Sequence, residues 1–251
     1  MAHSQNCFLR ELADLARVDL THTFFPGQPH AAIVPDERMR TVDLGPQNTS
    51  VMHEYCFVGQ WGTHIDAPLH FYSGARSVDE LPVEQSVLPL AVLDIHERVA
   101  TDPDATPSLD DIQAWEAAHG RIPEGSFVAL RTDWSLRWPD AAALDNIGSD
   151  GISHRPGWSR AVLEFLLEER NVAAIGHETP DTDTGHTIST ISDFPLERYV
   201  LGTGRWQIEL MANLRRVPAA GAVIFVGWPK PRGGSGFPVR AIALVAREFA
   251  R

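Results

Sequence analysis

Residues 62–70 read Gly-Thr-His-Ile-Asp-Ala-Pro-Leu-His, and this stretch decides how the rest of the chain is interpreted. His64 and Asp66 lie two residues apart, so on an extended segment their side chains point to the same side. Pro68 fixes its own φ and biases the preceding residue away from helix, which predicts a rigid turn that holds His70 nearby. The stretch therefore predicts a cluster of two imidazoles and one carboxylate.

Gln60 extends this cluster, because it stands four residues before His64 and shares its side if the segment stays extended. Gly62 permits a bent or closely approached backbone just before His64. Imidazole, carboxylate and amide oxygen suit a divalent ion such as Zn²⁺ or Mn²⁺, which activates water and polarises a carbonyl. His70 is then a candidate general acid or base. The alternative is that each is an ordinary surface or capping residue, and only their grouping favours a metal site.

Composition limits the other classes of function. The 251 residues carry a net charge of −12, which argues against binding nucleic acid or an anionic membrane and leaves a small-molecule substrate. Two cysteines exclude a disulfide framework. The N-terminus has no basic region followed by an apolar run, and no apolar stretch is long enough to span a bilayer, so we expect a cytoplasmic protein. No linker divides the chain, which favours one domain over residues 1–251.

Periodicity predicts a chain in which strands outnumber helices but helices lie between them. Helices are predicted at 5–17, 158–170 and after Ser108, which is a candidate N-cap for a helix closed by Gly120. Strands are predicted at 18–25, 51–60, 89–95, 126–132, 172–175, 205–210, 222–226 and 239–245. This order favours a mixed α/β domain with considerable β content over a doubly wound parallel sheet.

The stretch at 62–70 resembles the signature His-x-Gly-Thr-His-x-Asp-x-Pro-x-His of the cyclase family of metal-dependent hydrolases. That family includes bacterial kynurenine formamidases, isatin hydrolases and certain polyketide cyclases. The resemblance covers most of the chain, and shorter segments that support it lie at 19–22, 130–134, 154–158, 193–198 and 207–210. It implies a swivelling β/β/α fold with a mixed sheet and a homodimer or homotetramer. It also implies hydrolysis of an amide or a related carbonyl compound.

The resemblance also implies roles for single residues. His64 and Asp66 match metal ligands, His70 matches the catalytic histidine, and Glu209 matches a late carboxylate ligand of the two-metal members. Gln60 and Glu197 stand where the family has histidines. Because oxygen then replaces nitrogen at two positions, we expect Mn²⁺ to be favoured slightly over Zn²⁺, with one or two ions left open.

Further residues are candidates for substrate binding. His177 and His186 belong to a polar segment after the strand at 172–175, and one of them is expected to compensate for a missing family histidine; the alternative is a solvated acidic loop. Phe24, Phe25 and Trp61 are candidate walls of an aromatic pocket, although aromatic residues in strands are more often core.

The leading hypothesis is a metal-dependent hydrolase that cleaves an amide, lactam or lactone in a small, possibly aromatic substrate. In it His70 moves the proton, and Glu197 or Glu209 completes the metal shell or orients water. The alternatives are a metal-dependent polyketide-type cyclase and a non-catalytic protein that binds a small ligand. No Gly-x-Ser-x-Gly elbow is present, which disfavours serine chemistry.

Overall fold

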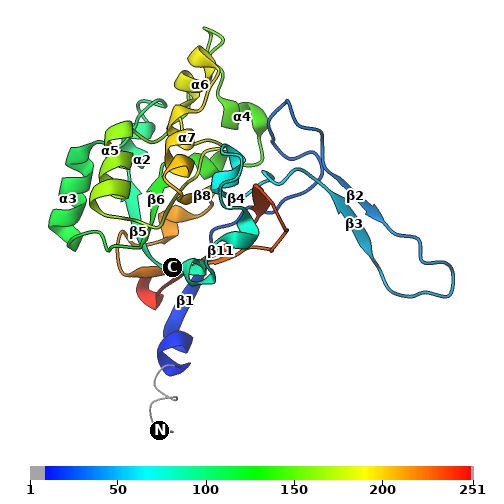
Figure 1. Cartoon of the computed structure of the whole chain (residues 1–251). Helices are drawn as coiled ribbons and strands as arrows, with labels where there is room; N and C mark the ends of the chain where they lie inside the picture. Colours follow the sequence, from blue (N-terminus) through cyan, green and yellow to red (C-terminus); the bar gives the residue numbers. More distant parts are fainter. Residues whose placement is uncertain (1–8, 250–251) are drawn as a thin grey trace.

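Nine strands form one mixed sheet in the computed structural model, which describes residues 9–249 (Figure 1). Their order across the sheet is β1-β11-β9-β5-β6-β7-β8-β4-β10. The strands are β1 Leu15–Asp19, β4 His64–Asp66, β5 Val87–Asp94, β6 Phe127–Arg131, β7 Ala174–His177, β8 Trp206–Glu209, β9 Ala222–Gly227, β10 Gly236–Pro238 and β11 Arg240–Ala246. Neighbours from β5 to β8 run parallel, and all other neighbours run antiparallel. The predicted mixed sheet is confirmed.

Helices fill the connections between the parallel strands and lie together on one side of the sheet (Figure 1). They are α2 His96–Val99, α3 Leu109–His119, α4 Ala141–Asp145, α5 Arg160–Glu164, α6 Gly185–Ile191 and α7 Pro195–Gly202. Parallel strands need such crossovers, which explains why helices intervene only in this part of the chain.

Two hydrophobic cores lie on the two faces of this sheet. Alternate residues of one strand divide between them: Leu90 and Val92 of β5 belong to the first core, whereas Ala91 and Leu93 belong to the second. The second core contains the buried side chains of α3 and α5, so it lies under the helices. The period of two along a strand therefore assigns every strand residue to the helix face or to the opposite face.

The predicted elements are largely present. Ser108 caps α3, since its hydroxyl accepts a hydrogen bond from the Asp111 amide, and Gly120 follows the helix with a φ of 86°. The helix predicted at 158–170 is present as α5 followed by a π-helical turn, Phe165–Glu169.

The N-terminal elements differ in their boundaries. Residues 9–14 are helical, but the helix predicted at 5–17 ends early because Leu15–Asp19 pairs with β11. Residues 5–8 of that predicted helix lie outside the described part of the chain. The strand predicted at 18–25 ends at Asp19, apart from an isolated bridge at Thr21.

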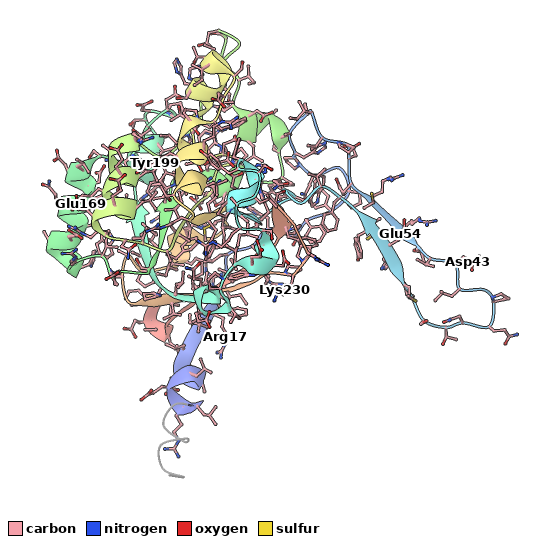
Figure 2. All side chains as sticks on the ribbon, in the orientation of Figure 1. Arg17, Asp43, Glu54, Glu169, Tyr199 and Lys230 are labelled. Atoms are coloured by element: carbon pink, nitrogen blue, oxygen red, sulfur yellow. The ribbon has the colours of Figure 1, made fainter. Side chains whose placement is uncertain are left out.

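A hairpin that periodicity did not predict projects from the body of the molecule. Its strands, β2 Arg38–Thr41 and β3 His53–Cys56, pair only with each other and are exposed along their whole length. Figure 2 shows the side chains of Asp43 and Glu54 on this hairpin, away from the sheet. The strand predicted at 51–60 is therefore shorter than expected, and the chain runs from β3 into the 62–70 stretch without regular structure. Among residues 9–249, no helix has the length and apolar character needed to cross a membrane.

Candidate metal centre

Two neighbouring antiparallel strands bring the predicted ligands together. β4 lies between β8 and β10, and its register places His64 opposite Glu209. Ile65, between the two polar residues of β4, points into the first hydrophobic core, so His64 and Asp66 point to the helix face. One ligand atom from each of His64, Asp66 and Glu209 lies within 4.8 Å of the other two. All three residues are buried.

A hydrogen bond to the backbone fixes the orientation of the His64 ring. Gly62 has a φ of 58°, and its carbonyl oxygen accepts a hydrogen bond from His64 Nδ1 at 2.8 Å. A Cβ at Gly62 would lie 3.3 Å from the Cβ of Phe24, so the close approach expected at this glycine is confirmed. A carbonyl oxygen can only accept, so Nδ1 carries the proton and a neutral His64 presents an unprotonated Nε2.

The free nitrogen of His64 faces two carboxylates. His64 Nε2 is buried without a hydrogen-bond partner and lies 3.3 Å from Asp66 Oδ2 and 3.5 Å from Glu209 Oε2. Burial lowers the pKa of His64, but Asp66 outweighs it and raises that pKa, so this nitrogen is satisfied either by a proton or by a cation that lies between it and the two oxygens. The donor set of one imidazole and two carboxylates therefore fits a divalent metal ion.

The charges around this group lead to the same conclusion. Burial raises the pKa of Glu209 well above its usual value, and the charges of Glu197 and Asp66 add to that effect. Burial also opposes ionisation of Asp66, but His64 and His70 outweigh it and lower the pKa of Asp66 to about 2. Several buried carboxylates compete for few positive charges, and a bound cation would relieve their repulsion.

His70 and Glu197 lie at the exposed side of the group. His70 ends the 3-10 turn Pro68–His70, and its Nε2 lies 3.7 Å from Glu197 Oε1. The His70 side chain is 30% exposed and that of Glu197 only 5%, so solvent reaches the imidazole and not the carboxylate. Asp183 holds Glu197 in place by accepting hydrogen bonds from the first amides of α7. An imidazole and a carboxylate can serve as general acid and base, and this catalytic role of His70 and Glu197 stays a prediction.

Gln60 reaches the group through its amide nitrogen. Its Nε2 lies 3.2 Å from Asp66 Oδ1, 3.3 Å from His70 Nδ1 and 3.4 Å from Ser235 Oγ. An amide NH₂ donates and cannot bind a metal, so in this conformation Gln60 orients Asp66. The role of Gln60 as a metal ligand stays a prediction.

The two candidate histidines of the polar segment lie in different places. His177 ends β7 and is fully buried, with Nε2 3.5 Å from Glu209 Oε1. The Trp158 indole N–H can only donate, and it lies 3.3 Å from His177 Nδ1, so a neutral His177 carries its proton on Nε2, which is buried without a hydrogen-bond partner. His186 is exposed on α6, beside His154, with ring centroids 6.4 Å apart. The alternative of a solvated loop is wrong for residues 177–179, 182 and 183, which are buried.

The three aromatic residues predicted to contact substrate differ in burial. Trp61 is fully buried, with its ring centroid 5.2 Å from that of His30. Phe24 and Phe25 are 41% and 38% exposed. Phe24 lines a cavity of about 560 Å³ together with Phe57 and other residues, and none of the ligand group lines it. Contact of these three residues with substrate stays a prediction.

Sequence reasoning gave no role of their own to two residues beside the ligands, the buried Gln207 and the half-buried Asp181. Gln207 lies opposite Asp66 in the strand register and donates to Glu209 Oε1 at 3.0 Å. Asp181 pairs with Arg155, and its charge acts on His64. The signal for Gln207 was available, because it stands two residues before Glu209 and must share its side of an extended strand.

A mixed α/β sheet that buries a convergent His–Asp–Glu group beside a partly exposed histidine and a buried glutamate is the arrangement expected of a metal-dependent hydrolase. The model of the family described as "Putative cyclase" matches residues 18–184, and the chain belongs to this Cyclase family. The resemblance inferred from residues 62–70 is thus confirmed.

Similar proteins agree with this assignment. An isatin hydrolase of Roseibium aggregatum is 32% identical over 246 residues, which cover 92% of each chain. A kynurenine formamidase of Salinibacter ruber is 27% identical over 187 residues, covering 72% of this chain and 74% of that one. The solved structure of an isatin hydrolase bound to the product analogue thioisatinate matches with a TM-score of 0.86 and 28% identity, over 98% of this chain and 100% of that one. The chain is therefore a metal-dependent hydrolase.

Proposed function

We propose that this protein hydrolyses the C–N bond of a cyclic amide in a small aromatic substrate of the isatin type. The observation that carries the proposal is the buried His64–Asp66–Glu209 group, in which one imidazole nitrogen and two carboxylate oxygens converge. The similarity to an isatin hydrolase over 92% of the chain supports the substrate class.

The ligand group would hold one divalent ion through His64 Nε2, Asp66 Oδ2 and Glu209 Oε2. When bound, this ion would lower the pKa of a water molecule and polarise the substrate carbonyl. Because two of the three ligand atoms are carboxylate oxygens, the set favours Mn²⁺ over Zn²⁺.

His70 would move the proton. In amide hydrolysis a C–O bond forms, the C–N bond breaks and the leaving nitrogen gains a proton. His70 is the solvent-facing imidazole of the site, so it is placed to take a proton from the attacking water and return it to the leaving nitrogen. Glu197, whose Oε1 lies 3.7 Å from His70 Nε2, would stabilise the imidazolium in between.

Phe24, which lies next to Gly62, and Phe25 are both partly exposed and are proposed to contact the aromatic ring of the substrate. We further propose that the chain forms a single domain, assembles as a homodimer or homotetramer and acts in the cytoplasm. These proposals rest on the sequence and on membership of the family.

The experiment measures bound metal by mass spectrometry and assays isatin, aryl-formamides and aryl lactones with and without a chelator. His70→Ala is compared with His96→Ala, a control in which the lost histidine is partly exposed on α2 and paired with Asp94. We expect chelation to abolish turnover, His70→Ala to reduce kcat about 10²–10⁴-fold, and the control to match wild type. Turnover that survives both chelation and His70→Ala would contradict the mechanism. A product that gains no ¹⁸O from labelled water would favour the polyketide-type cyclase.

A further inference from the structure

A glutamine lies between the two carboxylates of the ligand group. Gln207 of β8 is fully buried on the same strand face as Glu209 and directly opposite Asp66. Its Nε2 donates to Glu209 Oε1 at 3.0 Å and lies 3.5 Å from Asp66 Oδ2. One neutral side chain therefore contacts both anionic ligands.

The orientation of this amide is determined by its partners. Carboxylate oxygens only accept hydrogen bonds, so the NH₂ end of Gln207 must face Glu209 and Asp66. The other end is held by Thr182, which is buried as well and whose hydroxyl donates to Gln207 Oε1 at 2.7 Å. Thr182 thus prevents the amide from rotating its oxygen toward the carboxylates.

The hydrogen bond from Gln207 to one oxygen of Glu209 fixes the direction in which the other oxygen points. Gln207 occupies Oε1, and His177 approaches the same oxygen from 3.5 Å. Oε2 is the atom that faces His64 Nε2 at 3.5 Å. The amide therefore turns Glu209 so that one oxygen is engaged by the protein and the other remains available to a cation.

We propose that Gln207 is the positioning residue of the metal centre, that it presets the Glu209 and Asp66 carboxylates for a divalent cation, and that Thr182 sets its orientation. This inference rests on the proposed function, since it presumes that the His64–Asp66–Glu209 group binds a metal. Being uncharged, Gln207 engages Glu209 Oε1 and leaves Oε2 to the cation. Its longer 3.5 Å contact with Asp66 is to Oδ2, the oxygen that also faces His64. Hydrogen-bond partners of metal ligands typically contribute about 10–100-fold to metal affinity.

The experiment compares Gln207→Met, which keeps the length of the side chain and removes its donors, with Thr182→Val, which keeps its shape and removes the hydroxyl. Thr182→Ser retains the hydroxyl and serves as the conservative rescue. Gln85→Met is the matched control. Gln85 accepts a hydrogen bond at 2.8 Å from Trp206, and Trp206 belongs to β8, the strand that also carries Gln207. Mn²⁺ affinity is measured by competition with a chromophoric chelator, and circular dichroism checks that each variant is folded.

We expect Gln207→Met to weaken Mn²⁺ binding about 10–100-fold. Thr182→Val should weaken binding by a smaller factor, while Thr182→Ser and Gln85→Met should bind as wild type does. Folded Gln207→Met and Thr182→Val proteins with wild-type Mn²⁺ affinity would overturn the inference and leave the proposed function standing. If Gln207→Met does not fold, Thr182→Val alone decides. A wild-type protein that binds no divalent ion would instead overturn the proposed function.

Discussion

Within residues 9–249, two clusters each place a histidine close to at least two carboxylates, and the ligand atoms converge in the first of them and not in the second. In the first, His64, Asp66 and Glu209 are buried, and both carboxylates face the same ring nitrogen. In the second, His154 Nδ1 lies 2.5 Å from Asp104 Oδ2, while its Nε2 lies 3.1 Å from Asp150 Oδ2. The second cluster is 24–50% exposed.

The difference lies in which atoms remain available. Both ring nitrogens of His154 are already engaged by acids on opposite edges of the ring, so they cannot converge on a common ion. Hydrogen bonds to Asp104 and Asp150 raise the pKa of His154, and Asp66 likewise raises that of His64 against the effect of burial, so the two clusters differ in geometry and not in the direction of this shift. Composition alone does not distinguish the two clusters, but the direction of the free nitrogen does.

The largest expected effect comes from removing the free nitrogen of the first cluster. His64→Asn should lose bound metal and reduce kcat/KM on the order of 10³-fold, since the ion supplies several kcal/mol of transition-state stabilisation. His154→Asn should change both by less than about twofold, as is usual away from a site. Metal content and steady-state kinetics of the two variants test the comparison directly, and equal losses in both would break it.

Metal binding should also stabilise the fold through the first cluster alone. At a free Mn²⁺ concentration of about 100 times Kd, binding adds about 2.7 kcal/mol to the free energy of unfolding, which raises Tm by about 5–10 °C in a protein of this size. Calorimetry of the chelator-treated protein with added Mn²⁺ measures this shift. His154→Asn should show the full shift and His64→Asn none.

A smaller effect should distinguish the two histidines of the polar segment. His177→Phe removes the buried ring nitrogen that lies 3.5 Å from Glu209 Oε1, so Mn²⁺ affinity should fall about tenfold, the lower end of such effects. His186→Ala removes an exposed ring beside the second cluster, so affinity and KM should stay within about twofold. A titration of each variant with Mn²⁺ checks this, and a large loss in His186→Ala alone would reverse the assignment.

The smallest effect concerns pH and the second cluster. Because the pKa of His154 is raised in the folded state, its contribution to stability is fully present below the unfolded pKa of about 6.5 and is lost as pH rises through the folded pKa. His154→Asn should therefore be less stable than wild type at pH 5.5, and the difference should shrink at alkaline pH. Urea unfolding at several pH values measures it, and a difference that grows with pH would contradict this role.

Much of the first cluster could be predicted from sequence. A spacing of two on an extended segment places His64 and Asp66 on one side, and the family signature connects them to Glu209 across the strand pair. The same spacing would have found Gln207. Alternation and capping likewise predicted α3 and the central strands.

The remainder depends on tertiary structure that periodicity does not contain. His186 and His177 stand in one segment, but α6 carries one to the surface while β7 buries the other. β10 has only three residues, and its strand conformation depends on antiparallel pairing with β4. The exposed hairpin has no inward and outward faces, so no hydrophobic alternation could predict it.

The edges of the sheet have a consequence for solubility. The outermost strands, β1 and β10, are only five and three residues long, and β10 ends in Pro238, which has no N–H to offer a neighbouring chain. Short edges and proline are common protections against edge-to-edge aggregation. The strand that carries His64 is shielded between β8 and β10, so a variant that loses its metal but keeps its sheet should stay dispersed and can be purified for comparison.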